Sequence, residues 1–182
     1  MNQDQILSLE TVLKQLESYN NNFAHYFACL TTVNYEIKEL TSHFRRIANI
    51  NLAKPRSQKS KAHIAKIFKD AMKTNNKLVE SLETEIKNLT QIVSYLNEQK
   101  PKIDLVTTAV SKAKNNFSDA DVRKNAIKIV ANAKKLNNNL DLCKNYILPK
   151  NQAILEERKG LHTRLEYKYQ MLHYSSSEQV IA

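Results

Sequence analysis

Glycine, proline, cysteine and tryptophan are scarce in this chain of 182 residues, which has one Gly, three Pro, two Cys and no Trp. Many-stranded β folds need Gly and Pro in their turns, and phosphate-binding loops need several glycines, so both are excluded. Two cysteines are too few for a small secreted domain held together by disulfides. Hydrophobic residues make up 42% and charged residues 25% of the chain, which is enough for a globular core.

The length favours a single domain, which we expect to cover residues 1–174, with residues 175–182 as a frayed tail. The N-terminal residues lack the basic segment and apolar core of a secretory signal. No segment is apolar enough to be predicted to span a membrane. We therefore expect a cytoplasmic protein, and translocation by another route stays open.

One long helix is predicted at the start of the chain. Apolar residues recur there at spacings of three and four over six consecutive heptads, which is typical of coiled-coil-like packing. The first heptad position is filled by Leu9, Leu16, Phe23, Leu30, Ile37 and Phe44, and the fourth by Val12, Tyr19, Tyr26, Val33, Leu40 and Ile47. We expect this helix over about residues 4–51, a length of about 70 Å at ~1.5 Å per residue, and hence an elongated molecule.

Proline residues mark the next predicted boundaries. Pro55 is expected to end the first helix, since proline disfavours the helical conformation of the residue before it. Ser57 or Ser60 can cap a second helix that runs to about Gln99. Pro101 is then expected to make a tight turn and to begin a third helix, because proline is tolerated in a helix's first turn.

Two further interruptions are expected in the C-terminal half. Ser118 with Asp121 matches a capping box, which predicts a break or kink near residue 118. Pro149 is expected to interrupt the chain again, before a last helix over about residues 150–174. The apolar stripe of that last helix contains Arg158 and Lys168, so its helical signal is weaker.

No strand-like alternation of polar and apolar residues occurs in the chain. We therefore predict an all-α fold, an elongated antiparallel bundle of three to five long helices with coiled-coil-like packing.

The formal charge of +10 favours acidic partners. Lys54–Lys73 contains seven cations and one acid, Asp70, and the predicted turns bring cations from other helices to the same end of the bundle. The predicted anion-binding residues are Arg45, Arg46, Lys59, Lys61, Lys66, Lys69, Lys134 and Lys135. A solvated lysine-rich face is the simpler interpretation, and contact with duplex phosphate or an anionic membrane surface is the functional one.

Uncharged side chains are predicted to gather at the opposite end. Ser18–Tyr35 and Asn88–Asn97 contain no Asp, Glu, Lys or Arg, and antiparallel packing places them level with each other. A last helix that starts at Pro149 is too short to cover this end, so a groove lacking a fourth helix is expected. Self-association or binding of a partner helix would fill it, and a fold-back of the chain is the alternative. The predicted contact residues are Phe23, Ala24, Phe27, Ala28, Ile92 and Tyr95.

The sequence lacks several common catalytic motifs. HExxH, Walker, GxSxG and CxxC patterns are all lacking, and no histidine belongs to a Glu-x-x-His pair of the di-iron bundles. Cys29 and Cys143 are predicted at opposite ends of the bundle, so neither a disulfide nor a Cys–His metal cluster is expected. We predict no enzymatic activity, no catalytic residue, no metal, no cofactor and no small-molecule substrate.

The sequence therefore favours a non-enzymatic interaction protein, such as an adaptor, scaffold or effector-like protein. It would form a homodimer or bind a partner helix through its uncharged face. The alternative is a basic module that binds an anionic membrane surface or nucleic-acid phosphate through its positive end.

Overall fold

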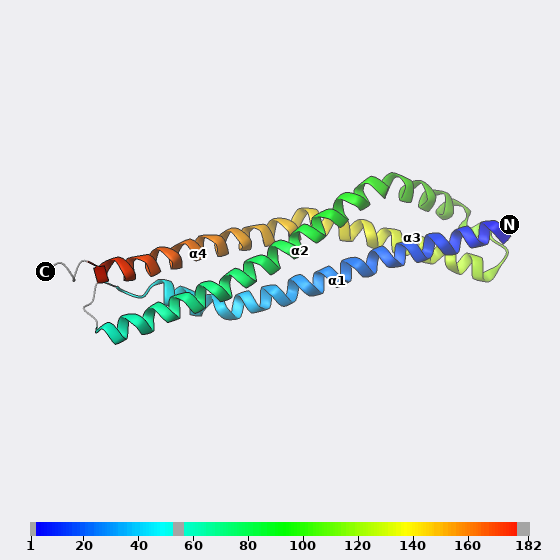
Figure 1. The fold of residues 1–182 in the computed structure, drawn as a ribbon. Helices are drawn as coiled ribbons and strands as arrows, with labels where there is room; N and C mark the ends of the chain where they lie inside the picture. The colour runs from blue at the N-terminus through cyan, green and yellow to red at the C-terminus, as the bar shows by residue number, and fades with distance from the viewer. Residues whose placement is uncertain (1–2, 53–56, 178–182) are drawn as a thin grey trace. The chain divides into compact units, whose positions relative to one another are not determined.

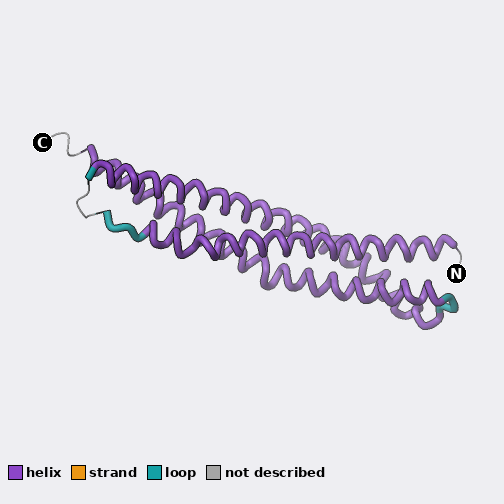
Figure 2. The backbone as a smooth tube through the Cα atoms, turned by 90° about the horizontal axis from the view of Figure 1, so that it is seen from below, coloured by secondary structure: helices purple, strands orange, loops and turns teal. Residues whose placement is uncertain are grey.

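The computed structural model describes residues 3–52 and 57–177, and the regular structure within these ranges is entirely helical (Figure 1). The helices are α1 (Gln3–Ala48), α2 (Gln58–Ala113), α3 (Ala120–Leu142) and α4 (Leu148–Ser177). A 3-10 turn covers Lys114–Asn116, and a π-helical turn covers Cys143–Ile147. Figure 2 shows that helix makes up nearly all of the described chain. The predicted all-α bundle of long helices is confirmed.

The chain divides into two units, each built from three helical segments. The first unit joins the residues up to Cys29 with Ile86–Lys150, and so contains the start of α1, the end of α2 and all of α3. The second unit joins Leu30–Glu85 with the residues from Asn151 onward, and so contains the rest of α1, the start of α2 and almost all of α4. This division does not test the predicted single domain over residues 1–174, which stays a prediction.

Each unit has its own apolar core. Of the two heptad lines predicted on α1, the line through Phe23 is buried over most of its length, and the line through Tyr19 is mostly half-buried. A third line, which the heptad pattern did not single out, carries the buried residues Leu13, Asn20 and Ala48. The largest buried apolar side chains include Leu16, Phe23, Leu89, Leu96, Ile129 and Leu136 in the first unit and Phe44, Phe68, Leu82 and Leu165 in the second.

Side-chain caps set the starts of two helices. The amide N–H of Ser60 donates to Ser57 Oγ over 3.2 Å, so the predicted cap of α2 is confirmed. The predicted break near residue 118 is also confirmed, but the capping side chain is that of Asp119, which accepts from the N–H groups of Asp121 and Val122 over 2.8 and 3.0 Å. Pro55, the predicted end of the first helix, lies outside the described residues.

The predicted turn at Pro101 is wrong, because α2 continues through this residue to Ala113. Proline inside a helix costs about 3 kcal/mol. The apolar stripe of α2 opposes that cost, since Ile103 and Val110 stay in helical register with Leu96 and are at least partly buried. The ring of Pro101 itself is exposed. The chain reverses only after α2 ends.

The interruption predicted at Pro149 is a π-helical turn just before this residue, and the chain stays helical through Pro149. α3 passes into α4 through the π-helical turn, in which the N–H of Leu148 donates to the carbonyl of Cys143. Such a turn adds a residue to the helix and is one of the places where helices bend. It directly precedes Pro149, whose ring would otherwise clash with the preceding turn. The last helix is therefore a continuation of α3.

The correction at Pro101 changes the predicted ends of the bundle. Because α2 does not reverse where expected, Lys134 and Lys135 lie in the first unit, and Lys66 belongs to the second. The part of α2 that lies beside Lys134 and Lys135 is the part around Lys100, whose Nζ donates to Asn137 Oδ1 over 2.7 Å. The first unit, which holds most of the uncharged stretch of α1, has three helical segments, as expected, and the second unit also has three. A groove there that a fourth helix would fill stays a prediction.

Candidate functional site

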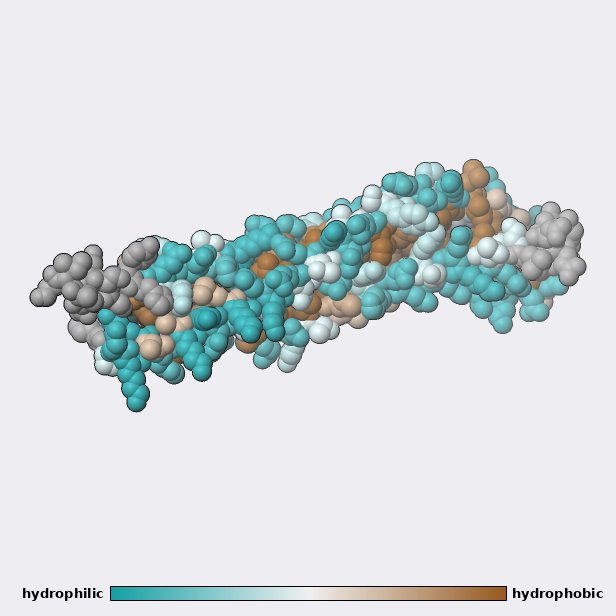
Figure 3. Space-filling model, in the orientation of Figure 1, coloured by the Kyte–Doolittle hydropathy of each residue, from teal (hydrophilic) through white to brown (hydrophobic). Residues whose placement is uncertain are grey.

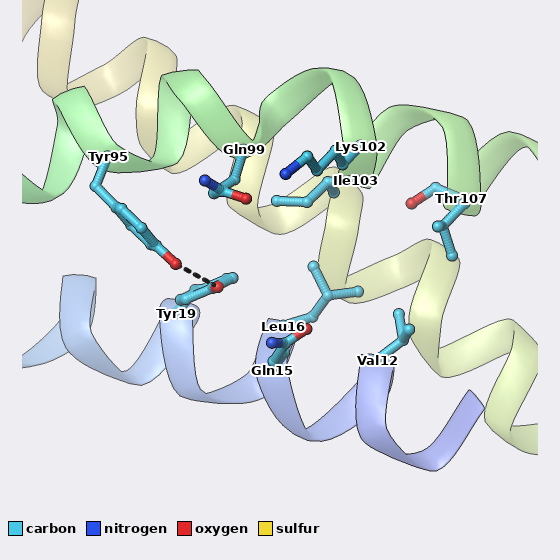
Figure 4. Close-up of a pocket in the computed structure, with 10 residues that line it drawn as sticks. Val12, Gln15, Leu16, Tyr19, Tyr95, Gln99, Lys102, Ile103 and Thr107 are labelled. Atoms are coloured by element: carbon cyan, nitrogen blue, oxygen red, sulfur yellow. Dashed lines mark hydrogen bonds between the residues drawn. The ribbon is translucent and has the colours of Figure 1, made fainter. Parts of the chain in front are cut away.

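A hollow of about 290 Å³ lies between α1 and α2 in the first unit (Figure 4). α1 contributes the wall from Val12 to Tyr19, and α2 contributes the wall from Tyr95 to Thr107. Figure 4 shows the two tyrosines at one end of the hollow and Val12 with Thr107 at the other. Its size is at the lower edge of that of small-molecule pockets, about 300–1,000 Å³.

The two tyrosines form one end of this hollow. Their hydroxyl oxygens are 3.4 Å apart, and their rings meet edge to face with centres 6.2 Å apart. The hydrogen bond with Tyr95, followed by burial, raises the pKa of Tyr19 to about 12. The Tyr19 phenol therefore keeps its proton at neutral pH. The hydrogen bond between the two hydroxyls uses one O–H group, so the other can donate to a third group.

The rest of the lining is apolar in its middle and polar along its edge. Leu16 and Ile103 face each other across the hollow in Figure 4. Lys102 is the one charged residue of the lining, and Gln99 lies beside it. The hydroxyl oxygen of Thr107 is buried and has no hydrogen-bond partner among the described residues. An unsatisfied buried hydroxyl costs about 1–3 kcal/mol.

A second candidate surface is the charge-free flank, by which we mean Ala24, Phe27 and Ala28 on α1. Ala24 and Ala28 are exposed, and Phe27 is half-buried with its ring centre 5.8 Å from that of Phe23. Phe27 follows Asn20 by seven residues, so it lies on the side of α1 that faces α3. Figure 3 shows that hydrophilic side chains cover most of one face of the protein, with hydrophobic side chains surfacing in separate patches.

The structure does not place all six predicted contact residues on one surface. Phe23 is completely buried and is a core residue. Ile92 is half-buried on α2, and Tyr95, which is 49% exposed, closes the hollow. Ala24, Phe27 and Ala28 remain as one continuous surface.

The predicted anion-binding residues fall into two groups. In the second unit, Arg46, Lys59, Lys66 and Lys69 are exposed and Lys61 is half-buried. The first turn of α2 contains no acidic residue to offset these lysines.

The remaining cations are placed differently. Arg45 Nη2 is 2.7 Å from Glu157 Oε1, with both side chains exposed. Lys134 and Lys135 are exposed in the first unit, so the predicted anion-binding residues do not form one cluster within either unit. Lys54 and Arg56, which belong to the same basic stretch, lie outside the described residues.

Buried polar side chains are the main feature that the sequence analysis missed. In the first unit, the amide nitrogen of Asn20 donates to the carbonyl of Asn132 over 3.0 Å, and that of Asn139 donates to Asn20 Oδ1 over 3.1 Å. In the second unit, Asn34 donates to Asn151 over 2.8 Å. The sequence carries one signal for these buried polar side chains, because polar residues recur at heptad spacing from Leu13 onward.

Arg158 is the most deeply buried charged residue among those described, at 2% exposure. Its guanidinium donates to the Ile37 carbonyl over 2.9 Å, to Asn75 Oδ1 over 3.3 Å and to the Thr41 hydroxyl. Asn75 donates back to the Arg158 carbonyl over 3.1 Å. Burial lowers the pKa of this guanidinium, but arginine stays charged at any physiological pH. This network locks α4 against α1 and α2 within the second unit.

The predicted separation of the two cysteines is wrong. The hydrogen bonds of Asn20 fix the register between α1 and α3, and that register places Cys29 level with Cys143 in the first unit. Both thiols are free, and Cys143 is fully buried. Cys29 Sγ lies 3.7 Å from His25 Nε2. The described residues contain no group of three or more His, Cys, Asp or Glu that could hold a metal ion.

Comparisons with known families, curated proteins and solved structures found no match to this chain. Within residues 3–52 and 57–177, no helix is long and apolar enough to cross a membrane.

Proposed function

We propose that the protein is a non-enzymatic interaction module, an adaptor- or scaffold-like protein, that self-associates or binds a partner helix through the charge-free flank of α1. The observation that carries this proposal is the exposure of Ala24 and Ala28 within a stretch, Ser18–Tyr35, that contains no Asp, Glu, Lys or Arg. Surface helices normally carry charged residues on the face that points toward solvent. A partner can bind an exposed helix face that has no charged residue without removing any ion from water.

The net charge restricts where a second copy of the chain can bind. Each copy has a formal charge of +10, so two copies repel each other over most of their surfaces. The flank formed by Ala24, Phe27 and Ala28 is a surface on which two copies can meet without opposing cations. The small side chains of Ala24 and Ala28 allow two helices to approach closely, and Phe27 supplies apolar area beside them.

The test of this proposal is sedimentation equilibrium of the protein over a range of concentrations. The expected result is a dimer that the double substitution Ala24→Glu with Ala28→Glu converts to a monomer with unchanged helicity. Ala131→Glu is the matched control, since Ala131 is an exposed alanine on α3 in the same unit. A wild-type monomer at all concentrations, or a dimer that the double variant retains, would refute self-association through this flank.

A second candidate function is anion binding by the cations of the second unit, and one observation favours it. Lys59 and Lys61 lie in the first turn of α2, where cations oppose the helix dipole by about 0.3–1 kcal/mol each. Helix stability therefore does not explain their position. The surface they share with Lys66 and Lys69 suits an anionic membrane or duplex phosphate, which require only charge.

This second candidate is tested by sedimentation with anionic vesicles and with duplex DNA across a salt series. The expected result is binding that weakens as salt rises and that Lys66→Glu with Lys69→Glu abolishes. Lys134→Glu with Lys135→Glu changes the net charge equally in the other unit and is expected to reduce binding much less. Equal loss in both variants would show that the net charge, and not this surface, attracts the anion.

A further inference from the structure

The hollow between α1 and α2 is a different surface from the charge-free flank, and its chemistry points to a ligand with two ends. Its middle is apolar, formed by Leu16 and Ile103 with Val12 and Val106 beside them. Lys102 is the one charged residue of the lining, and none of the lining residues is acidic. A ligand that satisfies both parts has an apolar chain and an anionic end.

The polar groups of the lining are mostly hydrogen-bond donors or groups that can donate. Lys102 carries an ammonium group, and Gln15 and Gln99 carry amide NH₂ groups. Figure 4 shows the Lys102 side chain extending along the α2 wall toward Gln99. The Tyr19–Tyr95 pair closes one end and keeps one O–H group that its internal hydrogen bond does not use.

We propose that this hollow binds a free alkyl carboxylate, with its carboxylate at Lys102 and its chain between Leu16 and Ile103. A carboxylate matches the single cation and the neighbouring amide donors. A phosphate is a poorer match, because the lining offers neither a second cation nor a helix N-terminus. The hydroxyl of Thr107, which also lines the hollow, is buried and has no hydrogen-bond partner among the described residues.

The experiment is calorimetric titration of the full chain with decanoate below its micelle concentration, together with NMR shifts of the side-chain methyl groups. Saturable binding is expected, with shifts centred on Val12, Leu16 and Ile103. Decanol and decyltrimethylammonium have similar chains without the anion, and both are expected to bind about tenfold more weakly or not at all.

Two matched variants test the role of the cation. Lys102→Gln is expected to weaken decanoate binding about tenfold, whereas Lys112→Gln removes the same charge from an exposed site on the same helix and is expected to leave binding unchanged. Val12→Phe fills the hollow from its half-buried edge and is expected to block binding while helicity is retained.

The proposal is overturned by any of three results. These are the absence of decanoate binding, equal binding of the three probes, and equal effects of the two lysine variants. The oligomeric state is measured separately, so these results do not depend on self-association through the charge-free flank.

Discussion

The guanidinium carbon of Arg158 lies 5.4 Å from the centre of the Phe44 ring, inside the second unit. A cation at this distance from an aromatic face is attracted by the ring. The other partners of Arg158 are neutral, namely the Ile37 carbonyl, the Thr41 hydroxyl and Asn75 Oδ1. The buried charge is thus held by dipoles and an aromatic ring, and no carboxylate hydrogen-bonds to it among the described residues.

Arg158→Ala is expected to lower the free energy of unfolding by about 3 kcal/mol, because it leaves buried acceptors unpaired and removes packing against Phe44. Arg164→Ala removes an exposed arginine from the same helix and is expected to change the free energy by less than about 0.5 kcal/mol. Urea unfolding followed by circular dichroism measures both values. Similar effects of the two substitutions would mean that the buried network does not stabilise the second unit.

Pro101→Ala is expected to raise the free energy of unfolding, by up to about 3 kcal/mol, because alanine restores an N–H group and removes a clash in a continuous helix. If Pro101 instead formed a turn, alanine would give no such gain and would loosen the connection. Thermal and urea unfolding decide between these outcomes. A loss of stability would contradict the continuous α2.

Asp119→Ala is expected to cost about 1 kcal/mol, because the Asp119 carboxylate accepts from two N–H groups at the start of α3. Ser118→Ala is the matched control one residue away. The sequence alone placed the cap at Ser118, and the structure places it at Asp119, so the two single variants separate these assignments. A larger loss for Ser118→Ala would favour the sequence-based assignment.

The two cysteines are expected to differ in their reactivity. Burial raises the pKa of the Cys143 thiol from 9.0 to about 12, so very little reactive thiolate forms at pH 8. A disulfide reagent at this pH is expected to modify the half-exposed Cys29 first and Cys143 only as the first unit opens. Mass spectrometry of partially modified protein checks the order, and equally fast modification of both thiols would contradict the buried position of Cys143.

The same shift predicts a pH dependence of stability. The unfolded chain ionises the Cys143 thiol above about pH 9, and the folded chain holds the proton until about pH 12. The contribution of this thiol is therefore complete below pH 9 and is lost as the pH rises toward 12. The raised pKa of Tyr19 makes stability fall in the same way from about pH 10. The wild type and Cys143→Ala are therefore compared between about pH 9 and 10. Over this range, the free energy of unfolding is expected to fall less with pH in the variant than in the wild type.

Local patterns allowed much of the fold to be predicted. The long helix at the start of the chain and the Ser57 cap depend on residues within one or two turns of each other, and both are confirmed. The turn at Pro101 was predicted wrongly because the penalty for proline is local, whereas the burial of Ile103 and Val110 that opposes it comes from packing against other helices.

The candidate site was only partly predictable for the same reason. Ala24 and Ala28 could be found from the lack of charge around them. Tyr19 was predicted as a heptad residue and Tyr95 as a contact residue of the uncharged end, but the hollow that they close depends on how far α1 and α2 separate. Arg158 was noted as a break in an apolar stripe, and only the structure shows the acceptors that make its burial possible.

The most direct test of the central claim is the accessibility of the Ala24 and Ala28 methyl groups to a soluble paramagnetic probe, measured by NMR at increasing protein concentration. The exposed methyl group of Ala131 is the internal reference. If two copies meet at the charge-free flank, the relaxation enhancement of Ala24 and Ala28 falls with concentration while that of Ala131 stays constant. Equal enhancement of all three methyl groups at every concentration would contradict self-association through this surface.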